Sequence, residues 1–295
     1  MIKNFDYKVP ATTNCVLINI NNWLTYEGKL LQNQKISGKL SPTFITTALA
    51  TNLEKDSSIK EFDTLLISRV ASDVAPYKSH TLFEDNQKYY NVPVSQVLGI
   101  FKNHSATFDN LQMLSDKVLI KKKSYANPYL EMFDSNMMTG EVIKLGDNVS
   151  KVKIGDVVFV RDNISTEVRL DTGVYYAFEE RMIVGIINNA DSLTTSHLIN
   201  QSILLRPYQA AKVLNSSILI TPDINFEDLD YSDLYNRDLF IVEHLDPTVK
   251  FINKGDILLI NRDYTNYVYY GLEKYFIIDG TKYISAKIKE KTNEK

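Results

Sequence analysis

The sequence predicts an all-β fold with little helix, arranged as three tandem copies of one small antiparallel β-barrel. Short apolar runs and alternating patterns, bounded by clusters of Asn, Asp, Ser and Gly, predominate over the 295 residues and are typical of strands joined by turns. Helical periodicity is scarce, and its best candidate, residues 207–217, is long enough for only a turn or two. The third observation is a turn-and-strand motif that occurs three times.

The repeated motif is clearest in KVKIGDVVFVRDN, residues 151–163. Gly155 can adopt the positive φ of a tight turn, and the side chain of Asp156 can hydrogen-bond the backbone just beyond it. The β-branched and aromatic run that follows favours an extended chain. The same order returns in INKGDILLINRDY, with Gly255, and more faintly in IKEFDTLLISRVA, with Asp63. The motif therefore predicts three equivalent turns, each followed by a strand.

Each copy of the motif has the same neighbours in the chain. An apolar strand precedes it, with the sequence CVLINI, DKVLIKKK or SILLRP. An aromatic pair follows it, just before a closing apolar strand: Tyr89-Tyr90, Tyr175-Tyr176 and Tyr275-Phe276. Because neighbouring side chains of a strand point to opposite faces, one ring of each pair can fill the module while the other faces outward. An outward ring suits packing between adjacent modules or contact with another protein.

The copies recur about every 90 to 100 residues, which matches a small domain and exceeds a solenoid repeat. We therefore expect three modules, over residues 1–107, 108–193 and 194–295. The polar, unpatterned segments 102–110 and 188–201 mark the boundaries between them. The third module is expected to end in a flexible charged tail, KIKEKTNEK.

Composition excludes several classes of partner. The 33 basic and 36 acidic residues give a net charge of -3, without the electrostatic footprint of a protein that binds nucleic acid or an anionic membrane. The one cysteine, Cys15, cannot form an internal disulfide and lies in an apolar run, so we expect a buried thiol and a reducing compartment. Without a signal-peptide core or an 18-residue apolar stretch, the sequence predicts neither secretion nor a membrane span.

The second module contains, in order, the segments DKVLIKKK, TGEVIKLGDNVSKVKIGDVVFV and GVYYAFEERMIVGII. In this order it closely resembles the GroES (chaperonin-10) family, whose barrels have a basic first strand, a Gly-Glu-Val strand, a Val-Gly-Asp-Val turn and a closing Ile-rich strand. The resemblance covers nearly all of residues 116–187, is partial over 202–288 and is faint over 15–101. It implies small barrels that work as a ring of single subunits on a seven-membered chaperonin ring. Three fused and diverged barrels do not map simply onto seven positions.

The family resemblance also implies a loop after the first strand whose apolar tripeptide binds the chaperonin. In the third module, Ile218, Leu219 and Ile220 follow two small residues near the expected offset and look like that tripeptide. The alternative is a core or edge strand, because short β-branched runs abound in this chain. In the second module the excursion is shorter than the family's, and its apolar candidates are Leu130, Met132 and Phe133.

The sequence offers no catalytic, cofactor-binding or metal site. GroES-like domains also occur in zinc-type alcohol dehydrogenases, but no segment here has the strand, G-x-G-x-x-G and helix of a dinucleotide-binding half. Cys15 has no apparent partner base, and no G-x-S-x-G elbow is present. We expect no enzyme activity and no cofactor. The histidines, which lack a second ligand at metal spacing, are His80, His104, His197 and His244.

Six acidic residues gather between Asp223 and Asp238. A calcium loop would need a glycine at its sharp turn, and this segment has none. A solvated insertion is therefore the favoured interpretation, with docking of a basic partner as the alternative.

Two functions follow from these observations. In the first, the protein is a non-enzymatic structural or assembly accessory of a bacteriophage virion, a capsid or portal-vertex auxiliary that forms a homo-oligomer and contacts capsid or portal-type subunits. In the second, it is a divergent phage or bacterial co-chaperonin that caps a chaperonin ring through the third-module loop. The tandem fusion, together with the shortened loop and reduced roof hairpin of the second module, favours the first. The abundance of Asn, Ile, Lys and Tyr fits an AT-rich source, and we expect the virion, or the host or bacterial cytoplasm, as the location.

Overall fold

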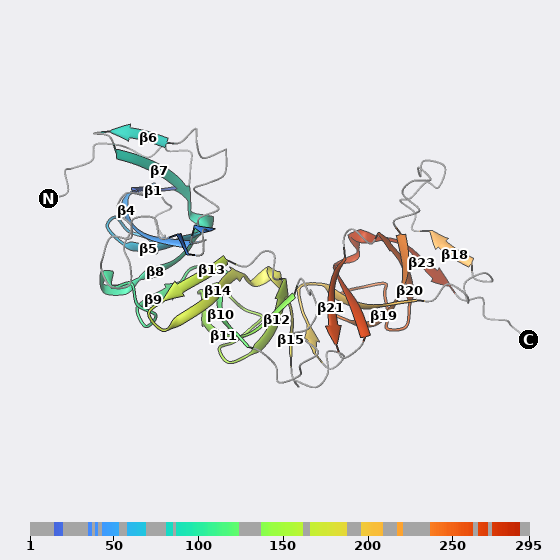
Figure 1. Ribbon diagram of the computed structural model, residues 1–295. Helices are drawn as coiled ribbons and strands as arrows, with labels where there is room; N and C mark the ends of the chain where they lie inside the picture. Colours follow the sequence, from blue (N-terminus) through green and yellow to red (C-terminus); the bar gives the residue numbers. More distant parts are fainter. Residues whose placement is uncertain are drawn as a thin grey trace, which may run out of the picture. The chain divides into compact units, whose positions relative to one another are not determined.

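The computed structural model describes residues 15–19, 35–36, 39–40, 43–52, 58–68, 81–84, 87–123, 137–161, 166–187, 196–208, 217–220, 237–261, 265–270 and 273–289. Within these ranges the chain is almost entirely β-structure, and helix is limited to three-residue 3-10 turns. The strands form three antiparallel seven-stranded sheets and one two-stranded ribbon (Figure 1). The all-β fold predicted from the sequence is therefore confirmed. None of these helical turns has the length or apolar character needed to traverse a lipid bilayer.

The three sheets share the order of their first six strands. The first sheet runs β6 (Thr81–Glu84), β7 (Gln87–Pro93), β1 (Cys15–Asn19), β4 (Thr43–Asn52), β5 (Thr64–Ser68), β8 (Val97–Phe101), β9 (Leu111–Met113). The second runs β13 (Thr166–Leu170), β14 (Gly173–Glu179), β10 (Lys117–Lys122), β11 (Met137–Leu145), β12 (Val157–Arg161), β15 (Ile183–Ile186), β16 (His197–Leu198). The third runs β21 (Asn266–Tyr270), β22 (Glu273–Asp279), β17 (Ser202–Pro207), β19 (Arg237–Leu245), β20 (Ile257–Asn261), β23 (Ile284–Lys289), β18 (Ser217–Ile220). The ribbon pairs β2 (Lys35–Ile36) with β3 (Lys39–Leu40).

The first six positions of each sheet are filled by equivalent strands, and the seventh differs. We call β8, β15 and β23 the closing strands. In the first two sheets the strand beyond the closing strand comes later in the chain, whereas in the third sheet β18 comes earlier. By packing, the chain divides into two compact units, and their boundary runs through the residues of the second sheet. The first unit contains Met1–Lys121, Val142–Gly155 and Ser165–Glu180, and the second contains Lys122–Glu141, Asp156–Ile164 and Arg181–Lys295.

The three predicted turns have equivalent geometry. Gly155 and Gly255 have φ values of 92° and 90°, and Phe62 takes the same place in the first module with φ 70°. The backbone N–H of each residue donates to a carbonyl of the preceding long strand: Phe62 to Ala48 at 2.7 Å, Gly155 to Val142 at 2.8 Å and Gly255 to Val242 at 2.8 Å. The faint first copy of the motif therefore forms the same turn with a non-glycine residue in the left-handed region.

Irregularities repeat as faithfully as the turns do. The strand after each turn pairs with a closing strand through a one-residue register shift, at Leu66/Ile67, Phe159/Val160 and Leu259/Ile260. A 3-10 turn leads into each closing strand: η2 (Val94–Gln96), η5 (Glu180–Met182) and η10 (Thr281–Tyr283). Bulges and short 3-10 turns are features that a sheet does not need, so their recurrence at matching places adds to the likeness of the three sheets.

The strands place alternate residues on opposite faces. In β5, Leu65 and Ile67 enter the core of the first module, whereas Leu66 joins a separate cluster on the other face. In β17, Leu204 likewise faces away from the third core, which its two neighbours enter. These strands therefore have two apolar faces. One face packs in the core of the strand's own module, and the other packs in a second apolar cluster.

The substitution Phe62→Gly is expected to stabilise the first module by about 1 kcal/mol, because glycine has no Cβ to oppose the left-handed backbone. Phe62→Ala removes the same ring but keeps the Cβ, so it should bring little of this gain. The measurement is the free energy of unfolding in urea for both variants. Equal effects of Gly and Ala would show that the positive φ of Phe62 carries no strain.

Candidate interaction surface

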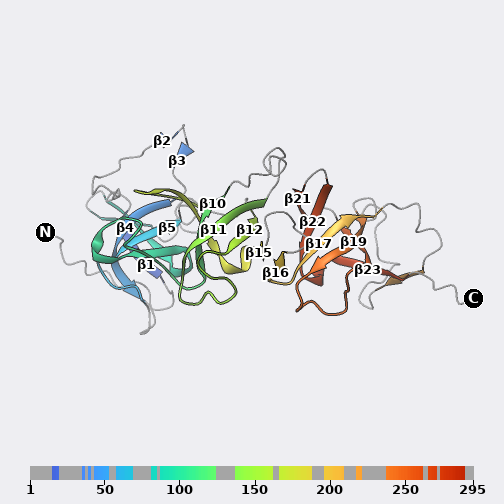
Figure 2. The ribbon, with the colours of Figure 1, turned by 90° about the horizontal axis from the view of Figure 1, so that it is seen from below.

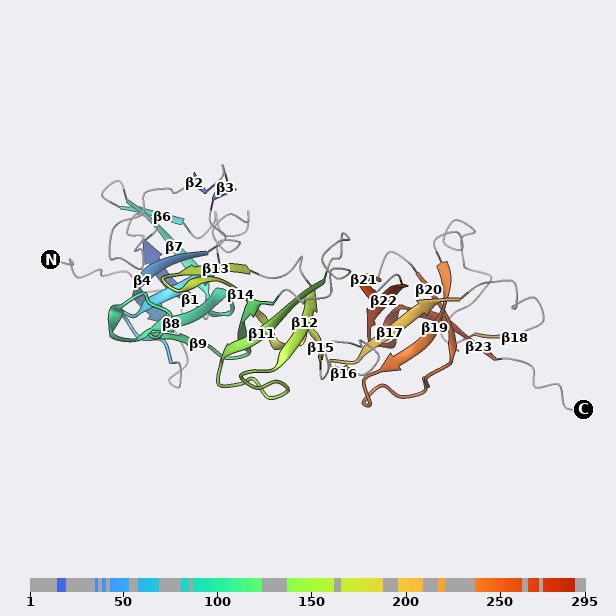
Figure 3. The same cartoon turned by 60° about the horizontal axis from the view of Figure 1, so that its bottom comes forward.

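The first and second modules meet through an apolar cluster inside the first unit. Strands β5, β8 and β9 contribute to it from the first sheet, and the β13–β14 hairpin contributes Val168, Leu170, Tyr175 and Ala177. Figures 1 and 3 show this hairpin beside the first sheet. The ring of Phe108 stacks on that of Tyr175 with centroids 5.1 Å apart. The backbone N–H of Phe108 also donates to Asp171 Oδ1 at 2.8 Å. This contact buries one face of the β13–β14 hairpin against the first sheet.

A lysine lies at the rim of this junction. The ammonium of Lys144 is 4.5 Å from the centroid of the Phe108 ring, in cation–π geometry. Burial lowers the pKa of Lys144 from its ordinary value, and the positive charge of Lys102 lowers it further, while Asp109 opposes both. The lysine stem thus covers apolar surface while its head stays in contact with an aromatic face.

The second and third modules meet in the same way inside the second unit. Phe159, Val184 and Leu198 from the second sheet form one cluster with Leu204, Tyr275 and Ile277 from the third. A polar contact accompanies it: His244 Nε2 donates to the carbonyl oxygen of Ser196 at 2.8 Å. Because a carbonyl can only accept, the contact assigns the proton to Nε2.

The junctions account for two of the predicted aromatic pairs. Tyr175 lies in the first junction and Tyr275 in the second, 4% and 7% exposed. Phe276, the next residue after Tyr275, fills the core of the third module, so the predicted division between inner and outer faces is confirmed there. The outward rings meet an adjacent module, which was one of the two alternatives from the sequence. The side chains of Tyr89 and Tyr90 lie outside the described residues.

Two short strands complete the junctions, and we call β9 and β16 the lead-in strands because each begins the next module. β9 pairs with closing strand β8, and β16 pairs with closing strand β15 (Figures 2 and 3). Where they cross, the closing strand has a glycine. A Cβ on Gly99 would lie 2.7 Å from the Gln112 carbonyl oxygen, and one on Gly185 would lie 2.9 Å from that of His197. These glycines permit a close approach of backbones.

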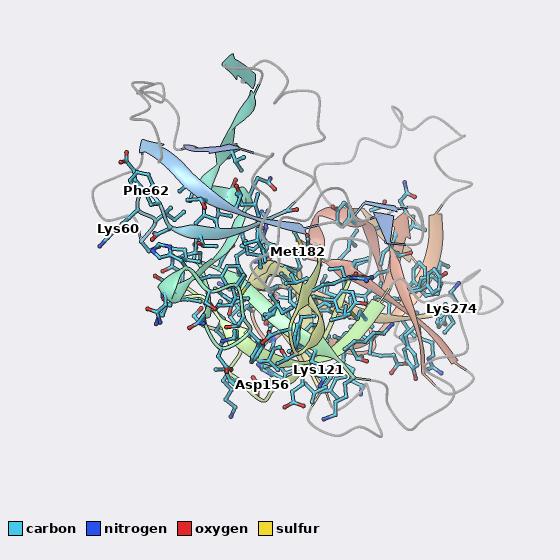
Figure 4. All side chains as sticks on the ribbon, turned by 60° about the vertical axis from the view of Figure 1, so that its left-hand side comes forward. Lys60, Phe62, Lys121, Asp156, Met182 and Lys274 are labelled. Carbon is cyan, nitrogen blue, oxygen red and sulfur yellow. The ribbon has the colours of Figure 1, made fainter. Side chains whose placement is uncertain are left out.

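The turns before β5, β12 and β20 expose large apolar side chains: Phe62 at 47%, Ile154 at 65% and Phe251 at 92%. Each turn is anchored by one buried residue, in order Ile59, Val152 and Ile252. Exposed lysines stand beside the apolar residues in all three modules: Lys60, Lys153, Lys250 and Lys254. Figure 4 shows Lys60 and Phe62 near each other at the margin of the molecule.

Phe251 is the most exposed of these residues, and its backbone is unusual. Its φ is 68°, in the left-handed region. The turn that carries it is held at both ends: Asp246 Oδ1 accepts from the Thr248 N–H at 2.8 Å, and Asp256 Oδ2 accepts from the Asn253 N–H at 2.6 Å. The ring is therefore presented to solvent by a turn with fixed ends.

The predicted loop tripeptide has a definite place. Ile218, Leu219 and Ile220 lie in β18, the last strand of the third sheet, and pair with Ile288, Lys287 and Ala286 of β23. Of the two alternatives from the sequence, the edge strand agrees with this pairing, while binding of a partner by the three residues stays a prediction. The other candidates, Leu130, Met132 and Phe133, lie outside the described residues.

The remaining predicted site features are dispersed. His104 Nδ1 lies 3.5 Å from Thr64 Oγ1, His197 begins β16, and His80 is outside the described residues. Cys15 begins β1, and its side chain is outside the described set, as is nearly all of the acidic segment. Among the residues that the structure describes, no three His, Cys, Asp or Glu side chains gather as a metal site would require.

Truncating the junction ring by Tyr275→Ala is expected to reduce the free energy of unfolding by about 3 kcal/mol, as for large aromatic residues in cores. Phe251→Ala is the matched control, because its ring is exposed, and should change stability by no more than about 0.5 kcal/mol. Urea unfolding of both variants measures the difference. A Tyr275→Ala loss as small as the control's would mean that the junction is not a packed interface.

Adding one methyl group by Gly185→Ala is expected to destabilise the second junction by about 1 to 3 kcal/mol, because the Cβ would overlap the β16 backbone and the Phe159 ring. Ala286→Gly, the reverse change at the equivalent place in β23, should cost about 1 kcal/mol at most. Hydrogen exchange of the β16 amides locates the effect, which should be faster exchange there. Unchanged protection in Gly185→Ala would refute the close-approach role of this glycine.

Similarity to known proteins assigns no family here. No protein-family model matches the sequence, and no curated protein matches it. The buried junctions, the lead-in strands and the exposed apolar turns are therefore the features on which a function can be based.

Proposed function

We propose that the protein is a non-enzymatic structural or assembly accessory that works through contacts with other proteins. The observation that carries this proposal is Phe251, 92% exposed on a turn whose neighbouring residue Ile252 is buried. Burying a phenylalanine ring is worth about 1.5 to 3 kcal/mol, and in the free chain this ring makes almost none of that contribution. A large apolar group held outward is a typical anchor of a protein interface.

The backbone at Phe251 strengthens the argument. A non-glycine residue in the left-handed region costs about 1 to 2 kcal/mol, and strain of this kind persists where the surrounding structure imposes it. The turn is imposed by Asp246, Asp256 and the buried Ile252, so the strained residue stays in place without a partner. The ring is thus positioned in advance, which lowers the entropy lost on binding.

Charge indicates the chemistry of the partner. Lys250 and Lys254 are exposed on either side of Phe251. An apolar pocket with carboxylates at its rim would bury the ring and pair with both ammonium groups. The turn before β12 has a similar pair of side chains, because exposed Ile154 directly follows exposed Lys153. We therefore propose partner subunits with acidic-rimmed apolar pockets.

Within this class we propose a bacteriophage virion component, a capsid or portal-vertex auxiliary that forms a homo-oligomer. Three features support it: the three similar sheets, the GroES-like motifs of the second module, and the abundance of Asn, Ile, Lys and Tyr, which fits an AT-rich genome. Several similar sheets in one chain, with exposed apolar turns, suit a part that contacts more than one neighbouring subunit. We also propose that each sheet closes into a barrel, and that the protein is located in the virion or in the host or bacterial cytoplasm.

A divergent co-chaperonin is the second candidate. It is supported by the apolar tripeptide Ile218-Leu219-Ile220, which lies on the last strand of the third sheet. In this case the partner is a chaperonin ring, and contact requires these three residues. The two candidates therefore depend on different parts of the third module.

Affinity capture with the full chain separates the candidates, using purified particles and host lysate with nucleotide present. The first proposal expects capsid or portal subunits, reduced at least tenfold by Phe251→Ser and unchanged by Val174→Ser, a matched exposed apolar residue. Recovery of a chaperonin that depends on Ile218 and Leu219 would instead establish the second candidate. Equal recovery by Phe251→Ser and the wild type would show that the turn is not the contact.

A further inference from the structure

Each closing strand has an outer edge that receives one more strand, and we call this edge the slot. In the first slot Met113 of β9 pairs with Gly99, and in the second Leu198 of β16 pairs with Gly185. In the third, Ile220 of β18 pairs with Ala286. The three acceptor residues are equivalent, because each pairs on its other side with the residue just before the register shift: Leu66, Phe159 and Leu259.

The occupants come from different parts of the chain. β9 and β16 are lead-in strands of the following module, whereas β18 belongs to the third module itself and comes between β17 and β19 in the chain (Figure 3). All three pair antiparallel and in the same register with respect to the equivalent acceptor residues. β18 therefore occupies the position in the third sheet that a lead-in strand occupies in the first two.

The third slot also differs in its own residues. Gly99 and Gly185 leave no room for a Cβ under their lead-in strands, yet the third slot has the methyl group of Ala286, which is fully buried. At the next position Ile100 and Ile186 are replaced by Lys287, whose Nζ is 2.6 Å from Asp256 Oδ2. A methyl group and a lysine both oppose the close apolar approach that the first two slots accept.

We infer that β18 is a built-in cap that closes the edge of β23 against strand addition by another chain, and that Ala286 disfavours a strand that approaches as closely as β9 and β16 do. An open sheet edge presents unpaired backbone groups that invite pairing with other chains, and proteins cover such edges or place lysines on them. The third module does both. The cap is independent of the proposed function, and it directs partner contacts away from this edge and toward side-chain surfaces such as the exposed turns.

The test opens the slot in the full chain. Leu219→Pro with Ile220→Pro removes two adjacent N–H groups of β18, so that pairing is lost whichever of them faces β23. Ala286→Gly is then added to restore the glycine of the other slots. The probe is a fluorescent synthetic peptide of residues 108–116, which contains β9, and binding is followed by fluorescence anisotropy and self-association by sedimentation velocity.

The wild type should show no peptide binding and no association through this edge. The triple variant should bind the peptide at least tenfold more tightly, with the double proline variant between them because Ala286 remains. Leu219→Val, which keeps a strand-forming residue, is the matched control and should behave as the wild type. Peptide binding by the wild type equal to that of the triple variant, or no binding by any variant, would overturn the inference.

Hydrogen exchange of the wild type keeps the inference testable if the proline variants unfold. With β18 in place, amides of β23 that point toward it should be protected at least tenfold relative to unstructured chain. Exchange at the unprotected rate along that edge, with the other edge of β23 protected by β20, would show that no cap is present and would overturn the proposal by itself.

Discussion

The backbone groups along the outer edge of each closing strand must find partners, and the arrangement of this chain depends on that requirement. An unpaired N–H or carbonyl that is removed from water costs about as much as a lost hydrogen bond, so a buried edge demands another strand. The first two sheets meet the demand with the opening residues of the following module. In both cases the opening strand of one module thereby becomes the seventh strand of the preceding sheet.

Apolar packing then builds on the strand pairing. The apolar side chains of the lead-in strands lie within the junction clusters, Leu111 and Met113 in the first and Leu198 in the second. Strands that face two apolar surfaces at once, such as β5 and β17, read in sequence as continuous rather than alternating runs. TLLIS and SILL therefore lack an alternating apolar pattern because both faces of these strands are buried, one of them in a junction.

Sequence patterns predicted the class of fold and the three turns, because glycine, aspartate and a β-branched run act locally. They also predicted that one ring of an aromatic pair faces outward, as Tyr275 and Phe276 show. The lead-in strands escaped detection, since two or three residues carry no periodicity and His197 lies within a segment that resembles a polar linker. The role of Gly99 and Gly185 could not be predicted from the sequence either, because it depends on the backbone of a lead-in strand that packs against them. The exposure of Phe251 depends on the fold of its turn, which the repeated motif does not encode.

The lead-in strands also set an order in time. A chain that emerges from the ribosome from its N-terminus cannot complete the first sheet until residues 111–113 have been made, nor the second until residues 197–198 have appeared. Each of these sheets therefore lacks its seventh strand until the first residues of the following module have been made. The third is assembled from strands between Ser202 and Lys289 and can finish without waiting. During synthesis the first and second sheets thus pass through a stage in which the outer edge of the closing strand has no partner, whereas in the third sheet β18 is made before the closing strand β23.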